Sequence, residues 1–126
     1  MSQSKRALLA DDDPIVRHIL GAILTAAGYS IDVVENGENC LAKLQTIDGG
    51  TQYDVLFLDM MLGDMTGMDV LRKIRPTISF PVIMLSAHQR DEALRFAGDM
   101  QPDAFLEKPF VAQTVSDALV SVGLAG

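Results

Sequence analysis

The hydrophobic positions at the start of the chain switch from the spacing of a strand to that of a helix. Residues 6–10 contain the short apolar run Ala-Leu-Leu-Ala, which predicts a strand. The apolar side chains that follow recur every three or four residues, at Ile15, Ile19, Leu20, Ile23, Leu24 and Ala27. This spacing predicts a helix, and Gly28 supplies its C-terminal stop.

A second strand and helix are predicted directly after the first pair. Residues 30–35 alternate apolar and polar side chains, as a half-exposed edge strand does. The apolar residues after them, Cys40, Leu41 and Leu44, return to helical spacing. Asn36-Gly37 is therefore a turn from strand to helix rather than the turn of a hairpin. Gly49-Gly50 closes this helix.

The rest of the chain repeats the same alternation. Strands are predicted at residues 55–58, 81–85 and 104–107, and the first two are continuous apolar runs, as in strands covered on both faces. Helical spacing follows each strand, around Val70, Leu71 and Ile74, over residues 89–98, and at Val111, Val115, Ala118, Leu119 and Val122. Five strand–helix units predict an α/β fold, a parallel sheet with helices on both faces and right-handed crossovers.

Polar side chains stand directly after four of the five predicted strands: Asp11 and Asp12, Asp59, Ser86, and Lys108. Parallel strands end at one edge of the sheet, where ligands bind in open α/β folds. Adjacent carboxylates repel one another, and a hard cation such as Mg²⁺ is the usual reason to gather them. Alternatively, Asp13 caps the helix that Pro14 begins and the other two acids are solvated. The triplet alone leaves both interpretations open.

Size and composition narrow the class of protein. The 126 residues predict one domain, and 48% hydrophobic residues suffice for a packed core. A net charge of −7 with scattered basic residues argues against nucleic-acid binding, which needs clustered cations. The lone cysteine, Cys40, excludes an internal disulfide and is expected to be a buried filler. Without a signal peptide or membrane span, a soluble cytoplasmic protein is expected.

Four segments, LLADDDPIVR, LFLDMMLGDMTG, VIMLSAH and FLEKPF, resemble the receiver domain of two-component response regulators. The resemblance extends over residues 1–126. It implies a flavodoxin-like, doubly wound sheet of strand order 2-1-3-4-5. It also implies a phosphorylation-dependent switch without enzymatic turnover of its own. The phosphoryl donor would be a histidine kinase or a histidine phosphotransfer protein, and the downstream protein target is unknown.

The resemblance assigns the chemistry residue by residue. Asp59 is implied to be the phosphoacceptor, a carboxylate that attacks the phosphorus of a phosphohistidine. The carboxylates of Asp11, Asp12 and Asp59 and the backbone carbonyl of Met61 would hold Mg²⁺, an all-oxygen set that suits this ion. The metal would offset the repulsion between the carboxylate and the incoming phosphate. Asp13 lies one position too far along to match this set, so helix capping is its expected role.

Further roles come from the same resemblance. Lys108 would place a positive charge beside a phosphate oxygen, and the Lys108-Pro109 bond is expected to be cis. The hydroxyl of Ser86 would donate to the phosphoryl group and move inward when one is present. That motion would be coupled to Phe105, where the family more often has tyrosine. An aromatic side chain at this position fits a core equally well.

The chain departs from the family pattern at several positions. Gly63 replaces a frequent proline, so a more mobile loop is expected after the phosphoacceptor. Gln101-Pro102 replaces a frequent Gly-Ala, which puts the backbone of that turn in doubt. Met61 and His88 flank the expected path of the hydrolytic water. The apolar Met61 cannot orient this water, which predicts a long-lived acyl phosphate. His88 and His18 are expected to be surface residues.

Three other functions fit these residues less well than the signalling switch. A Mg²⁺-dependent phosphatase of the haloacid dehalogenase type needs a D-x-D nucleophile on the first strand and a cap, whereas this chain has adjacent acids and no room for a cap. A flavin module needs a phosphate loop rich in Ser, Thr or Gly in place of the aspartates. A pseudo-receiver would lack part of the acid–lysine set. A stand-alone receiver, monomeric or weakly dimeric, is expected, with a domain separated from a longer regulator or kinase as the alternative.

Overall fold

The computed structural model describes residues 5–45, 53–86 and 101–124. The strands within these ranges are β1 (Lys5–Ala10), β2 (Tyr29–Val34), β3 (Val55–Asp59), β4 (Val82–Ser86) and β5 (Ala104–Glu107). The helices are α1 (Pro14–Ala26), α2 (Gly37–Leu44), α4 (Gly67–Ile74) and α6 (Ala112–Ser121). The predicted strands and four of the predicted helices are confirmed. The helix predicted over residues 89–98 and the stop at Gly49-Gly50 lie outside the described residues.

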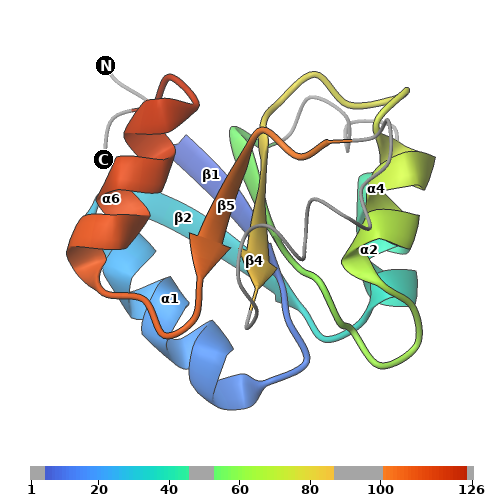
Figure 1. Cartoon of the computed structure of the whole chain (residues 1–126), viewed down its shortest axis with the longest axis horizontal. Helices are drawn as coiled ribbons and strands as arrows, with labels where there is room; N and C mark the ends of the chain where they lie inside the picture. The colour runs from blue at the N-terminus through green and yellow to red at the C-terminus, as the bar shows by residue number, and fades with distance from the viewer. Residues whose placement is uncertain (1–4, 46–52, 87–100, 125–126) are drawn as a thin grey trace.

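The five strands form one parallel sheet in the order β2-β1-β3-β4-β5, as predicted. Figure 1 shows α1 and α6 on one face of this sheet and α2 and α4 on the other. The order places β1 and β3 side by side at the centre, with Ala10 opposite Leu58. The ends of these two strands therefore meet at one point on the carboxyl edge of the sheet.

The core has two halves, one on each face of the sheet. Side chains of a strand alternate between faces, so Leu8 and Ala10 pack with α2 and α4 while Ala7 and Leu9 pack with α1 and α6. All residues of β3 and β4 are buried, as their continuous apolar runs predict. Cys40 is completely buried, which confirms it as a core filler. This double cover holds the central strands rigidly under the site.

Helix α1 begins as its sequence predicts. The carboxylate of Asp13 accepts a hydrogen bond of 2.9 Å from the backbone N–H of Ile15, and Pro14 occupies the first turn. The apolar stripe of α1 is wider than the face that the sheet covers, because Leu20 and Leu24 are buried whereas Ile15 and Ile19 are 66% and 44% exposed. Their positions lie about 100° or more around the helix from the buried residues. Helical spacing alone could not make that distinction.

None of the helices in the described ranges is long and apolar enough to cross a membrane. His18 is exposed on α1, as predicted, whereas His88 lies outside the described residues.

Candidate phosphoacceptor and metal site

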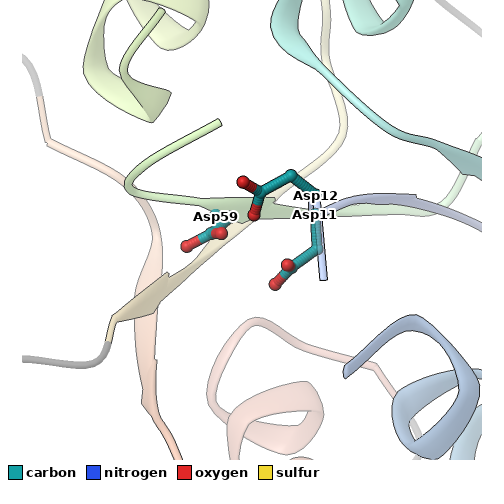
Figure 2. Close-up of side chains that lie close together, drawn as sticks. All are labelled: Asp11, Asp12 and Asp59. Carbon is teal, nitrogen blue, oxygen red and sulfur yellow. The ribbon is translucent and has the colours of Figure 1, made fainter. Parts of the chain in front are cut away.

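Three carboxylates converge where β1 and β3 end. Asp11 and Asp12 follow β1, and Asp59 is the last residue of β3. One oxygen from each carboxylate lies within 4.8 Å of the other two, and Figure 2 shows the three side chains gathered in the same space. Asp11 and Asp59 are buried, whereas Asp12 is exposed at the mouth of the site. The predicted convergence of these residues is therefore present in the fold.

The backbone and side chain of Asp11 are both held in place, and its N–H donates a 3.3 Å hydrogen bond to the carbonyl of Val34. Its Oδ1 accepts a 2.9 Å hydrogen bond from the N–H of Asp13, and its carbonyl accepts a 2.8 Å bond from the guanidinium of Arg17. Its buried Oδ2 forms an ion pair of 2.9 Å with the Lys108 ammonium and has no other polar partner among the described residues. The contact from Arg17 was missed in the sequence, because an arginine on a helix surface carries no sign of its partner.

Lys108 reaches the site from the end of β5. Its Nζ lies 2.9 Å from Oδ2 of Asp11 and 3.3 Å from Oδ1 of Asp59. Burial by itself lowers the pKa of Lys108, but the pairing with the two carboxylates outweighs it and the pKa is raised. The backbone N–H of Lys108 donates a 2.8 Å hydrogen bond to the carbonyl of Ser86, and the peptide bond to Pro109 is cis, as expected.

Asp59 is 6% exposed, and its surroundings disfavour the ionised form of its carboxyl group. Burial and then the neighbouring charge of Asp11 raise the pKa of Asp59 to about 6, against the opposing effect of Lys108. Asp59 is consequently ionised near neutral pH but poorly solvated. Such a carboxylate gains from a cation or a new covalent partner, and perturbed pKa values of this kind concentrate at functional sites.

A short hairpin formed by residues 60–67 follows Asp59. The N–H of Gly67 donates to the carbonyl of Met60 over 2.7 Å, and Leu62 donates to Met65 over 3.1 Å, so Met61 and Thr66 form an antiparallel bridge between these bonds. In such a non-hydrogen-bonded pair the N–H and carbonyl of Met61 point away from the partner strand. The N–H of Met61 indeed lies 3.4 Å from Oδ1 of Asp59. The carbonyl of Met61 is thereby directed to the side of the carboxylates.

Two glycines shape this hairpin. A Cβ on Gly67 would collide with the backbone carbonyl of Asp59, so the residue must lack a side chain. Gly63 has a φ of 86°, a left-handed conformation that proline cannot adopt, although proline is frequent here in the family that the sequence resembles. The expected mobility of the loop stays a prediction. The need for glycine at position 67 was missed, since nothing in the sequence reveals the approach of the Asp59 backbone.

Ser86 and Phe105 lie on the same face of the sheet. Ser86 is the last residue of β4 and is 1% exposed. Phe105 stands opposite Met84 in the β4–β5 pair and packs, half-buried, against the core beside α2 and α4. Side chains two apart on a strand share a face, which places Met84, Ser86 and Phe105 together. The coupled movement of Ser86 and Phe105 stays a prediction.

The residues of this site suit a hard divalent cation. The three carboxylates supply only oxygen ligands, which Mg²⁺ prefers, and the exposure of Asp12 leaves room for retained waters. The Oδ2 of Asp11 is buried and is paired only with the Lys108 ammonium among the described residues, so a carboxylate lone pair remains for a cation. The donor set therefore fits the expected ion.

Comparison with families of known proteins matches residues 7–120 to the response regulator receiver domain. The chain belongs to this family. Receiver domains act in two-component systems, and phosphorylation of an aspartate is characteristic of them. They bind Mg²⁺ at an acidic pocket and interact with histidine kinases or phosphotransfer proteins. In this receiver domain the described residues include one such acidic cluster, Asp11, Asp12 and Asp59.

Individual relatives place the domain in proteins of different lengths. The transcriptional regulatory protein ResD of Bacillus subtilis (strain 168) is 34% identical over 111 residues, which cover 87% of this chain and 44% of ResD. The sensory/regulatory protein RpfC of Xanthomonas campestris is 31% identical over 128 residues, or 98% of this chain and 17% of RpfC. The receiver domain thus spans less than half the length of these relatives.

A solved structure matches almost end to end. The chemotaxis response regulator CheY4 of Vibrio cholerae has a TM-score of 0.79 and 25% identity, with 95% of this chain and 99% of that chain covered. The match extends the agreement in fold to a chain that is covered almost completely. The relatives of this receiver domain therefore include both long regulators and a protein of its own size.

Proposed function

We propose that this receiver domain accepts a phosphoryl group on Asp59 from a histidine kinase or a histidine phosphotransfer protein, in a reaction that depends on Mg²⁺. One observation carries the proposal: the buried carboxylate of Asp59 lies beside two further carboxylates and a half-buried lysine. Such a carboxylate is a nucleophile whose surroundings are prepared to receive a charged group.

The chemical step follows from these positions. A carboxylate oxygen of Asp59 attacks the phosphorus of the phosphohistidine, and the phosphorus–nitrogen bond breaks as the imidazole leaves with its electron pair. Lys108, 3.3 Å from Asp59, then shifts its ammonium toward an oxygen of the transferred group. Burial of Asp59 and Asp11 keeps water away from the nucleophile and strengthens these charge interactions.

The metal would be held by the carboxylates of Asp11, Asp12 and Asp59 and the carbonyl of Met61. Bound there, Mg²⁺ supplies positive charge that offsets the repulsion between carboxylate and phosphate. The orientation of the Met61 N–H toward Asp59 supports a carbonyl on the same side of the hairpin. Asp13 is assigned to capping α1 and not to the metal, because its side chain bonds the N–H of Ile15.

The output of the domain would be a change in its surface. The hydroxyl of Ser86 would donate to the new phosphoryl oxygens, and Phe105, on the same face of the sheet, would follow its movement. The domain would act as a phosphoacceptor and protein-binding switch rather than as an enzyme. Cytoplasmic location, lack of direct nucleic-acid binding and a monomeric or weakly dimeric state belong to the same proposal. A stand-alone receiver is also proposed, with a domain separated from a longer regulator or kinase as the alternative.

Phosphorylation by a small donor tests the proposal directly. The protein is incubated with phosphoramidate and Mg²⁺, and intact-mass spectrometry follows the addition of one phosphoryl group. We expect an adduct that is stable in acid, labile to hydroxylamine and absent from Asp59→Asn. An adduct that persists in Asp59→Asn, or no adduct on the wild type, contradicts the proposal.

The aspartate triplet provides its own matched control. Asp12→Ala removes an exposed carboxylate of the cluster, whereas Asp13→Ala removes the exposed neighbour that caps α1. We expect Asp12→Ala to weaken Mg²⁺ binding and slow phosphorylation by roughly tenfold or more. Asp13→Ala should leave both unchanged while it lowers thermal stability. The same loss of Mg²⁺ affinity in both variants would contradict the assignment of the metal ligands.

A further inference from the structure

The hairpin of residues 60–67 is attached to a helix that takes no part in the proposed chemistry. At its tip, Oδ1 of Asp64 accepts a 2.9 Å hydrogen bond from the N–H of Gly37, and Oδ2 accepts a 2.9 Å bond from the N–H of Glu38. Both donors lie in the first turn of α2. One carboxylate thus bridges two elements that are 27 residues apart in the chain.

This contact complements the cap that α2 already has. Asn36 accepts from the N–H of Asn39, so Asp64 satisfies two of the remaining first-turn donors of the helix. The negative charge also favours the positive end of the helix dipole. The same two donors hold the pKa of Asp64 below its ordinary value. The carboxylate is therefore ionised, and both of its oxygens are engaged by the first turn of α2.

Apolar packing also joins the tip of the hairpin to α2. The side chain of Met65 lies directly against the backbone of Gly37, so the hairpin meets α2 through apolar as well as polar contacts. Leu62 is buried in the core and fixes the base of the first arm. Gly63, with its left-handed backbone, makes no side-chain contact, which leaves Asp64 as the polar anchor of the tip. Without it, the tip of the hairpin is joined to α2, among the described residues, through the apolar contact of Met65 alone.

We propose that Asp64 is a positioning residue for the metal site. By attaching the hairpin to α2, Asp64 keeps the carbonyl of Met61 in place. The inference rests on the proposed Mg²⁺ site, to which Met61 contributes an oxygen. Asp64 itself touches neither the metal nor the phosphoryl group. Its effect is transmitted through the backbone of Leu62 and Gly63, and the two cross-strand hydrogen bonds of the hairpin limit the freedom of this segment.

A purely structural role makes a different prediction. If Asp64 only stabilised α2, any loss of a cap on that helix would have the same consequence for the metal. Asn36→Ala is the matched control, because it removes the helix's own cap and leaves the hairpin contact intact. Asp64→Asn keeps one acceptor oxygen and gives an intermediate case.

The first measurement is Mg²⁺ affinity by titration calorimetry at a temperature well below unfolding. We expect Asp64→Ala to weaken Mg²⁺ binding about fivefold. This loss is smaller than the loss expected when a direct partner of a metal ligand is removed, because Leu62 still anchors the hairpin. Asp64→Asn should show a smaller loss and Asn36→Ala none, even though all three variants melt at lower temperature. Equal affinities for Asp64→Ala and Asn36→Ala would overturn the inference, as would unchanged affinity in Asp64→Ala. Absence of Mg²⁺ binding in the wild type would instead refute the proposed function.

Thermodynamic reciprocity supplies a second readout in the wild type. If the Asp64 contact strengthens Mg²⁺ binding, Mg²⁺ must strengthen the contact by the same factor. Hydrogen exchange of the Gly37 and Glu38 amides, followed by NMR, should slow about fivefold in saturating Mg²⁺, while exchange of the Asn39 amide, bonded to Asn36, should not change. Unaltered exchange at Gly37 and Glu38 in saturating Mg²⁺ would contradict the coupling.

Discussion

The ammonium of Lys108 lies closer to Asp11, at 2.9 Å from Oδ2, than to the proposed phosphoacceptor Asp59, at 3.3 Å from Oδ1. In the metal-free protein the lysine therefore neutralises the same buried carboxylates that are proposed to hold the cation. Lys108 and a divalent cation would compete for the charge of these oxygens. This competition makes the state of the metal site depend on a residue that is proposed to act on the phosphate.

Replacement of Lys108 by methionine should separate the two effects. The metal-free variant is expected to be destabilised by about 2 kcal/mol, less than for a fully buried pair because Lys108 is 19% exposed. Its Mg²⁺ affinity should rise, since a competing positive charge is removed. Chemical denaturation with and without Mg²⁺ checks both points. Lys73→Met, which removes an exposed charge of α4, is the control for net charge. Weaker Mg²⁺ binding in Lys108→Met would refute the competition.

The raised pKa of Asp59 predicts a pH dependence of stability. Burial first, and then the charge of Asp11, raise this pKa from 3.8 to about 6. Because the folded state prefers the protonated carboxyl, its contribution to stability is fully present below about pH 4 and is lost as the pH rises through 6. We expect Asp59→Asn to raise the melting temperature of the metal-free protein by a few degrees at about pH 8 and to leave it almost unchanged at about pH 4.

Addition of Mg²⁺ should make the wild type melt at a higher temperature than Asp59→Asn at about pH 8. At about pH 8 the cation binds the ionised site of the wild type and stabilises it by mass action, whereas Asp59→Asn lacks a ligand and gains little. Thermal denaturation at both pH values with and without Mg²⁺ tests the four conditions together. A metal-free Asp59→Asn protein that melts below the wild type at about pH 8 would disprove the burial of an ionised carboxylate.

The contact between Gly67 and the Asp59 carbonyl predicts a strict requirement for glycine. Gly67→Ala forces the backbone at the end of β3 to move, and we expect a loss of about 2 kcal/mol in stability together with slower phosphorylation by phosphoramidate. Gly21→Ala is the control, since its Cβ would meet only the flexible end of Ile31 and it gains helix propensity within α1. If Gly67→Ala were phosphorylated at the wild-type rate, the end of β3 would tolerate the movement of its backbone and the requirement for glycine would be refuted.

The side chain of Met61 predicts the lifetime of the acyl phosphate. Met61 is 60% exposed beside the site and has no group that orients an attacking water. Met61→Asn should shorten the lifetime severalfold, measured by the decay of the phosphorylated mass after the donor is removed. Val120→Asn, an equally exposed apolar position on α6, controls for the change in polarity. The hypothesis fails if both variants decay at the wild-type rate.

The local pattern of apolar and polar residues along the chain was enough to predict most of the strands and helices. The strand and helix periods arise from contacts between near neighbours, so the runs at residues 55–58 and 81–85 were identified as buried strands without any knowledge of their partners. The cap at Asp13 was equally local, because its bond to Ile15 spans two residues. These periods contain no information about the order of the strands, which the family resemblance alone supplied.

The candidate site was predicted from a single rule, that parallel strands end at one edge. This rule, together with the resemblance, identified Asp11, Asp12, Asp59, Ser86 and Lys108 before their distances were known. It could not tell that the Lys108 ammonium lies 2.9 Å from Oδ2 of Asp11, closer than it lies to Asp59. Nor could it identify Ile15 as exposed, since helical spacing does not show how wide a face the sheet covers.

By itself, then, the sequence determined the elements, the family and the residues that carry the proposed chemistry. Only the tertiary structure decided which groups hold those residues in place. The bond from Arg17 to Asp11, the approach of Gly67 to Asp59 and the contact of Asp64 with α2 join segments that no local pattern connects. The physical reason is that such contacts depend on the packing of the whole sheet and its helices, while hydrophobic periodicity records only which face of each element is buried.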